Sequence, residues 1–439
     1  MHDEVDQSGA PTWLESISSQ LNHFAIHSII TIPAHYTFHV YNNRTVAYND
    51  FRKVVIVSVE HVASNIKRIR FAKGFSQAQV AELSDLSRVA YGNIEKGVSI
   101  PKVSTLQEIA RALDVKLQDL IIPVAQLKAV RFRASKRMNS RDQVLADVSR
   151  WLYDFNFLED QLQEKLAYAF SSIQLPSPSG VERPMRSAEQ ARQLLGLNPS
   201  ESIRDISGLL ESSGIKVYPM ASTSEGFFGL SIATSDGGPA IVVNVWDRIS
   251  VERWIFSAAH ELGHLLLHLD TYDVDESFEE EVQEKEANTF ASYFLMPDKA
   301  FRSEWAETYG LPYVDRVLKV KRIFQVSYKT VLSRLSTGSD LGDSAWGKFY
   351  AQYKQRYGRA LGRTDEPDAL PPDSFQASFP EVLRSREPDS LSSYAFIEDR
   401  LSRLVRVAIE SDEVSVSRGA EILRLDLGAM RERVASWVE

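Results

Sequence analysis

Between residues 62 and 121, apolar positions recur at the spacing of short helices. Ile66 and Ile69 begin a helix that Gly74 ends, and Ser76 is suited to cap a second helix, Gln77 to Leu83. The same spacing predicts three more helices: Ser87 to about Glu95, Thr105 to Leu113, and Leu117 to Ile121. This part of the chain is therefore predicted to form a bundle of five short helices.

The flanking segments follow other patterns. Residues 29–57 alternate as strands do, with Asn42-Asn43 as a turn, and could form a β-appendage, a mobile arm or an extension outside the folded core. Beyond residue 123 we expect a linker with a short strand, Val130 to Arg133, and a long helix, Ser140 to Ser171. The loop at residues 176–180, rich in Pro and Ser, marks a boundary.

The second half mixes strand and helix periods. We expect helices near Ala188 to Leu195 and Ile203 to Ser213, a strand Lys216 to Pro219, a hairpin of Phe228 to Ala233 with Ala240 to Val245, and two longer helices, Val251 to His268 and Glu279 to Met296. The acidic, Pro-rich residues 365–373 precede a helical region. Its end, residues 414–430, could be a helix-turn-helix-like pair or a packing or oligomerisation unit. The predicted fold class is α+β, mostly helical.

Composition narrows the class of protein. The 439 residues contain no cysteine, which excludes disulfides, thiolate zinc sites and iron–sulfur clusters and fits a cytoplasmic protein. The N-terminus lacks a basic region, and apolar runs are short, so neither a secretory signal nor a membrane segment is expected. Net charge is −9, yet residues 59–122 carry nine Lys/Arg against seven Asp/Glu and residues 128–150 carry seven against two. A locally basic N-terminal third is the pattern expected if only this part meets DNA.

The segment His260-Glu261-Leu262-Gly263-His264 matches H-E-x-x-H. Residues four apart on a helix lie on one face, about 6 Å apart along the axis, so the two imidazoles can share one Zn²⁺. Glu261 could hold a water molecule and accept its proton. His268 lies about 12 Å along the axis from His260, so we expect it beside the metal ligands and not among them.

A catalytic zinc needs a third protein ligand and one open position. The acidic residues 279–286 lead into an apolar helix face, and Glu284 shares a face with Ala287 and Ala291, which would turn it toward the metal. Composition alone leaves Glu286 open as the alternative.

These motifs, with Glu284-x-x-Ala287-Asn288 and Leu295-Met296-Pro297 after them, resemble the ImmA/IrrE family of metallopeptidases over residues 190–336. The resemblance implies a zincin-like domain with Glu284 as the third ligand. It further implies cleavage of a helix-turn-helix repressor, and thus a proteolytic switch.

The helical bundle resembles the lambda-repressor-like (XRE-type) domains through Phe75-Ser76-Gln77, Leu86-Ser87 and Ile94-Glu95-Lys96-Gly97. The resemblance implies that the third helix enters the major groove of double-stranded DNA, and that the domain binds as a homodimer. The residues expected to contact DNA are Gln77, Ser87, Arg88, Tyr91, Asn93 and Lys96. A protein-interaction module of the same shape is the alternative. The basic residues from Arg131 to Arg141 could extend the phosphate contacts or dock against the acidic peptidase domain.

We therefore expect five segments: an extension (1–57), the DNA-binding domain (58–122), a basic helical linker (123–180), the zinc metallopeptidase domain (181–340) and a helical C-terminal region (341–439). The expected function is a cytoplasmic transcriptional regulator that binds an operator and, by a latent or active zinc endopeptidase, cleaves a protein such as a repressor or antitoxin. The alternative is a non-proteolytic, metal-containing sensor, of toxin–antitoxin or mobile-element type, whose peptidase-like domain binds only a ligand or partner.

Overall fold

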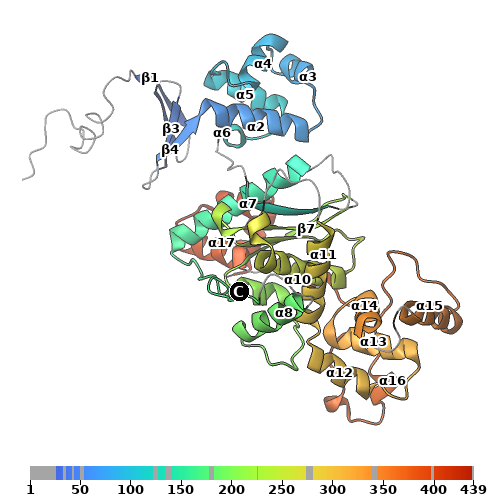
Figure 1. Ribbon diagram of the computed structural model, residues 1–439. Coiled ribbons are helices and arrows are strands. Elements are labelled where there is room, and N and C mark those ends of the chain that lie inside the picture. The colour runs from blue at the N-terminus through green and yellow to red at the C-terminus, as the bar shows by residue number, and fades with distance from the viewer. Residues whose placement is uncertain are drawn as a thin grey trace, which may run out of the picture. The chain divides into compact units, whose positions relative to one another are not determined.

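The computed structural model describes residues 26–32, 36–41, 44–49, 54–121, 127–134, 141–176, 182–224, 226–272, 280–338, 342, 344–396 and 400–437. These residues belong to two compact units (Figure 1). Unit 1 comprises residues 1–125 and 140–147, and unit 2 comprises residues 126–139 and 148–439. No helix among the described residues is both long and apolar enough to cross a lipid bilayer.

Unit 1 begins with an antiparallel four-stranded sheet in the order β1-β2-β3-β4. Its strands are β1 (Ile26–Ile32), β2 (Tyr36–Tyr41), β3 (Arg44–Asn49) and β4 (Val54–Ser58). The strands expected from the alternation in residues 29–57 are therefore present, while the expected turn at Asn42-Asn43 lies outside the described residues.

Five helices follow in unit 1, as the apolar spacing predicts: α2 (Val59–Ala72), α3 (Gln77–Leu83), α4 (Arg88–Glu95), α5 (Val103–Ala112) and α6 (Leu117–Ile121). Ser76 caps α3 in a reciprocal capping box with Gln79, and the Ser87 hydroxyl accepts from the backbone N–H of Ala90 at the start of α4. One apolar core joins the helices, with Ile66, Tyr91 and Ile109 completely buried.

Unit 2 is built on a second four-stranded sheet, in the order β5-β7-β8-β6. The strands are β5 (Val130–Ala134), β6 (Lys216–Met220), β7 (Phe227–Ile232) and β8 (Ala240–Asn244); β6 runs parallel to β8 and the other pairs are antiparallel. The expected hairpin is thus confirmed as β7–β8. Part of the expected linker also belongs to this sheet, because β5 pairs with β7.

Unit 2 also contains these helices: α8 (Arg183–Leu194), α9 (Ile206–Ser212), α10 (Val251–Leu267), α11 (Glu281–Leu295), α12 (Asp298–Glu307), α13 (Tyr313–Phe324), α14 (Tyr328–Gly338), α15 (Ser344–Tyr357), α16 (Asp373–Gln376), α17 (Arg400–Glu410), α18 (Val416–Ile422) and α19 (Leu427–Ala435). Helix α10 packs against β7 and β8 on one side and against α11 on the other. The two helices expected to carry the chemistry are therefore central to the domain.

Helix α7 (Arg141–Leu162) is shorter than the expected helix of residues 140–171. It stops because Gln163 has a left-handed backbone, with φ of 55°, and the chain then leaves the helix axis. Its second half is joined to the C-terminal helices by buried charges. Glu159 forms ion pairs with Lys216 of β6 and Arg400 of α17.

Candidate metal centre and DNA-binding helix

Helices α10 and α11 carry the candidate metal ligands, and the sequence lets them approach closely. A Cβ atom on Gly263 would lie 3.0 Å from the Phe290 ring and 3.3 Å from the Cα of Ala287. The glycine between the two histidines of the motif is therefore what admits the backbone of α11. Both histidines, His260 and His264, are completely buried.

His260, His264 and Glu284 form one cluster, with a ligand atom of each within 4.8 Å of the others. The two Nε2 atoms are 2.9 Å apart. The Glu284 carboxylate lies 3.0 Å from the Nε2 atom of His264 and 3.4 Å from the Nε2 atom of His260. Tetrahedral ligands at the bond lengths of zinc are separated by about 3.3 Å. The three groups therefore fit a Zn²⁺ ion with little rearrangement.

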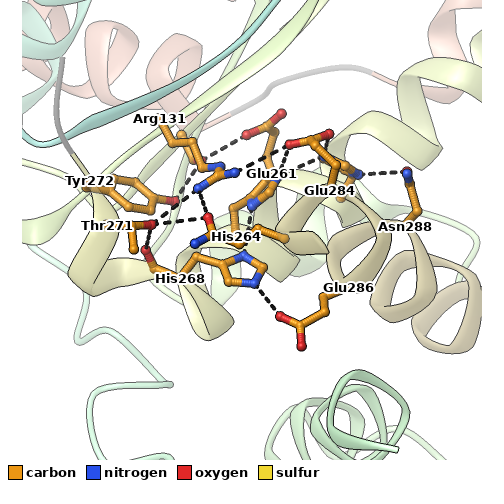
Figure 2. Close-up of polar contacts among 12 residues, drawn as sticks. Arg131, Glu261, His264, His268, Thr271, Tyr272, Glu284, Glu286 and Asn288 are labelled. Atoms are coloured by element: carbon orange, nitrogen blue, oxygen red, sulfur yellow. Dashed lines mark hydrogen bonds and ion pairs between the residues drawn. The ribbon is translucent and has the colours of Figure 1, made fainter. Parts of the chain in front are cut away.

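Outer hydrogen bonds fix which imidazole nitrogens face the cluster (Figure 2). His260 Nδ1 lies 3.0 Å from Asn288 Oδ1, an acceptor, so this nitrogen donates. His268 Nε2 donates to Glu286 at 2.8 Å, which leaves its Nδ1 to accept from His264 Nδ1 at 2.9 Å. Both Nε2 atoms thus present lone pairs toward Glu284, as metal ligands require.

The protonation states agree with a cation site. Burial lowers the pKa of His264 well below its ordinary value, so its imidazole is neutral. Burial alone would raise the pKa of Glu284, but the two imidazoles against its carboxylate outweigh burial and hold the pKa below the ordinary range. The neutral imidazole of His264, the imidazole of His260 and the Glu284 carboxylate converge on one point, where a divalent cation would balance the negative charge.

Glu286, the alternative third ligand, lies elsewhere. Its carboxylate bonds to His268 and lies 3.6 Å from Arg183, which also donates to the Leu267 carbonyl at the end of α10. His268 is outside the cluster, as the axial distance predicts, and connects Glu286 to His264. Glu286 and His268 therefore orient His264, a candidate metal ligand, through hydrogen bonds on the side of its ring away from the cluster.

Glu261, the candidate proton acceptor, is buried beneath β7. Its Oε2 accepts a 2.8 Å hydrogen bond from Ser231, whose hydroxyl accepts one of 2.7 Å from Tyr272. At Gly229, two residues before Ser231, a Cβ would lie 3.0 Å from Glu261 Oε1. Burial raises the pKa of Tyr272 well above its ordinary value, so the phenol keeps its proton and donates it.

Arg131 completes the site from β5 (Figure 2). Its guanidinium lies 3.6 Å from Glu284 Oε1 and donates to Thr271 Oγ1 at 3.2 Å and to Gln283. Of the two roles open to this arginine from the sequence, the structure places it against the acidic helix of the peptidase-like domain.

Three residues of this site, Arg131, Ser231 and Tyr272, are not among the predicted site residues. Ser231 had a local signal, since Gly229 and Ser231 alternate on the β7 face that must accept a helix. Arg131 and Tyr272 reach the site through pairings distant in sequence, for which no motif exists.

In unit 1, Gln77 and Glu95 belong to a buried polar group. Arg70 forms an ion pair of 2.5 Å with Glu95, and the Gln77 amide donates to the same carboxylate at 2.8 Å. This group ties α2, α3 and α4 together. Gln77 is half-buried, so the side chain predicted to contact a phosphate is already held in place by its hydrogen bond to Glu95.

The remaining residues predicted to contact DNA lie in and around α4. Ser87, Arg88 and Lys96 are exposed and Asn93 is half-exposed. Tyr91 is wrong as a DNA contact, because its ring is completely buried in the core of the bundle. Tyr91 and Ile94 are three residues apart and share the inward face of α4.

Comparisons with known proteins agree with this geometry. Residues 66–120 match the helix-turn-helix family, and residues 210–336 match the IrrE N-terminal-like domain of the M78 peptidases. An HTH-type transcriptional regulator of Sinorhizobium fredii, y4dJ, is 39% identical over 62 residues, which cover 14% of this chain and 80% of the relative. The apo form of ComR from S. thermophilus aligns with 86% of this chain and 98% of its own at 14% identity, but its TM-score of 0.14 carries no argument about the fold.

The two family matches coincide with the two sites described above. The helix-turn-helix match begins in the middle of α2 and reaches into α6, and the peptidase match contains β6, β7, β8 and both helices of the candidate metal centre. The chain therefore belongs to the HTH-type transcriptional regulators, as a DNA-binding protein fused to a peptidase-like domain of the IrrE type.

Proposed function

We propose that this regulator is also a zinc-dependent endopeptidase that cleaves a protein substrate, such as a helix-turn-helix repressor or an antitoxin. The observation that carries the proposal is the position of Glu261, a buried carboxylate one residue from a ligand of the cluster and held by Ser231. A zinc site that only stabilised the fold would need no such carboxylate beside it.

His260, His264 and Glu284 would hold the ion, and the network behind them would keep both imidazoles neutral and correctly oriented. When bound, Zn²⁺ supplies a Lewis acid that polarises a peptide carbonyl and makes water more acidic.

The other steps fall to side chains of the protein. Glu261 accepts the proton of the attacking water at its carboxylate and passes it to the leaving amine. The Ser231 hydroxyl holds the carboxylate in the orientation that this transfer needs, and Tyr272 holds the hydroxyl. Because Glu261 is buried under β7, the reacting group is shielded from bulk water.

The DNA-binding part would place this activity at an operator, bound as a homodimer through α4. Arg88 and Lys96 are exposed on and just after α4 and available for phosphate or base contacts. The expected sign is an operator affinity that falls with rising salt, with a smaller salt dependence in variants of either residue.

The test compares wild type, Glu261→Gln and Glu281→Gln, a matched control on the exposed start of α11. Each protein is incubated with a cell lysate, and new protein N-termini are identified by mass spectrometry beside measurement of bound zinc. The wild type and the control should generate the same new termini with one zinc per chain, while Glu261→Gln should keep the zinc and generate none. Identical termini in all three samples would refute the proposal.

A second function, a sensor that does not cleave, is favoured by one observation: Arg131 of β5 already lies against Glu284. In that case the domain would bind a ligand or partner through the same residues. Zinc retained in all three proteins, with no new termini in any lysate, would favour the sensor.

A further inference from the structure

Strand β5 occupies an edge of the sheet that the matched peptidase domain would leave open. That match begins at residue 210 and contains β6, β7 and β8, whereas β5 lies far upstream at Val130–Ala134. In the sheet order β5-β7-β8-β6, the strand β7 would be the free edge without β5. An open edge presents unpaired N–H and C=O groups to which an extended peptide can add as a new strand.

The edge filled by β5 is also the edge nearest the reacting groups. In the antiparallel register, Arg131 pairs with Ser231 and Arg133 with Gly229. Ser231 donates to Glu261, and Gly229 leaves no room for a side chain beside that carboxylate. A peptide paired with β7 in this way would run alongside the two β7 residues that contact Glu261.

The side chain of Arg131 is a second respect in which β5 resembles a bound substrate. Its guanidinium reaches across to Glu284, one of the three candidate ligands, while Val130 beside it is completely buried. The strand is held at its start by Asp236, whose carboxylate accepts from the backbone N–H groups of Lys128 and Ala129. Besides its pairing with β7 and the buried Val130, β5 is therefore held by polar contacts at its start and at Arg131.

We infer that β5 is a displaceable, substrate-like strand that keeps the peptide-binding edge of β7 closed, and that a substrate enters by replacing it. The inference rests on the proposed peptidase function for its meaning. The substrate class it implies is an extended segment with the pattern of β5, an arginine flanked by apolar residues, so that the arginine lies beside Glu284.

The chain offers a direct test, because it contains no cysteine and an engineered pair would be its only disulfide. Val130 and Ile232 are cross-strand partners in β5 and β7, at a separation that suits a disulfide. Val130→Cys with Ile232→Cys locks β5 in place when oxidised and releases it with a phosphine reductant. Val217→Cys with Ile241→Cys, between β6 and β8, is the matched lock across strands that should never separate.

Binding is measured in the full chain, loaded with zinc and carrying Glu261→Gln so that nothing is cut. The probe is a fluorescent synthetic peptide with the sequence of residues 127–134, followed by anisotropy. Because a tethered strand competes at an effective concentration near millimolar, probe binding to the reduced protein should be weak but measurable. The oxidised β5 lock should weaken it at least tenfold, reduction should restore it, and the control lock should have no effect.

Loosening β5 should act in the opposite direction. Asp236→Ala removes the anchor without touching the metal cluster, so probe affinity should rise about tenfold with zinc content unchanged. Arg131→Ala should do the same, whereas a role for Arg131 in holding Glu284 for the metal predicts loss of zinc.

Three results would overturn the inference: equal binding to the oxidised and reduced lock, absence of binding to every reduced or loosened form, or zinc loss in Arg131→Ala without tighter peptide binding. Failure of the proposed function looks different. Proteins with Glu261 intact would then bind the peptide in a lock-dependent way yet cut neither it nor any protein in a lysate.

Discussion

The choice between Glu284 and Glu286 as the third metal ligand can be tested through zinc-dependent stability. Glu284→Gln removes a carboxylate whose oxygens lie 3.0 and 3.4 Å from the two Nε2 atoms of the cluster. Glu286→Gln is a matched change two residues away, at a carboxylate that reaches only His268 and Arg183. Glu284→Gln should therefore remove a metal ligand, whereas Glu286→Gln should remove only a residue that helps to orient the ligand His264.

The expected magnitudes follow from mass action. With free zinc at about 100 times the dissociation constant, binding stabilises the wild type by ~2.7 kcal/mol. If losing the ligand weakens binding at least about 100-fold, the gain for Glu284→Gln falls to ~0.4 kcal/mol. Loss of an outer partner typically costs about tenfold or somewhat more, which leaves ~1.4 kcal/mol for Glu286→Gln. At roughly 2 °C per kcal/mol in a unit of this size, zinc should raise Tm by about 5, 1 and 3 °C respectively.

The assay is thermal unfolding of chelator-treated protein with and without buffered zinc, supported by metal analysis after dialysis. The metal-free proteins should unfold within about 2 °C of one another, because the change is a single charge at a partly exposed side chain. A zinc response that survives in Glu284→Gln and disappears in Glu286→Gln would show that the ligand assignment is wrong.

Three further predictions concern other parts of the molecule. Glu159→Ala should lower the free energy of unfolding of unit 2 by about 3–5 kcal/mol in urea denaturation, because it leaves Lys216 and Arg400 buried without their carboxylate, and a loss under about 1 kcal/mol would contradict this. Ser231→Ala should retain zinc but slow cleavage about tenfold or more in a peptide assay; unchanged cleavage would remove Ser231 from the proposed mechanism. Arg88→Ala should weaken operator binding and reduce its salt dependence by about one ion, measured by anisotropy at several salt concentrations, and an unchanged slope would exclude a phosphate contact.

Much of the fold could be predicted from local pattern. The five helices of unit 1, the β7–β8 hairpin and both long helices of the metal centre follow from periods of 3.6 and 2 with capping and turn residues. His260, His264 and Glu261 could be predicted equally well, because their spacing on one helix already determines how they lie relative to one another. Predicting Glu284 required a second helix, whose inward face can be recognised from its acidic and apolar residues.

The features that could not be predicted depend on contacts between residues distant in sequence or on local backbone conformation. The end of α7 is set by a left-handed Gln163, a residue without strong preference for that state. The spacing of Tyr91 to Ile94 by itself indicates the core, so for Tyr91 the apolar period is a better guide than its place in the DNA-binding helix. Arg131 reaches Glu284 only because β5 pairs with a strand about a hundred residues later, and no local property of the sequence signals that pairing.

The absent side chain at Gly263 has a consequence for which ions the site can prefer. His260 and His264 extend from one helix and Glu284 from the next, so the separation of the two helices sets how far apart the ligand atoms can lie. A Cβ at Gly263 would lie 3.3 Å from the Cα of Ala287, so any larger residue at this position would push the two helices apart. Bonds near 2.0–2.2 Å suit such a spacing, while the 2.3–2.6 Å bonds and larger ligand number of Ca²⁺ do not. At the proposed metal site, a hydrogen atom in place of a methyl group would thus favour a small cation such as Zn²⁺ over Ca²⁺.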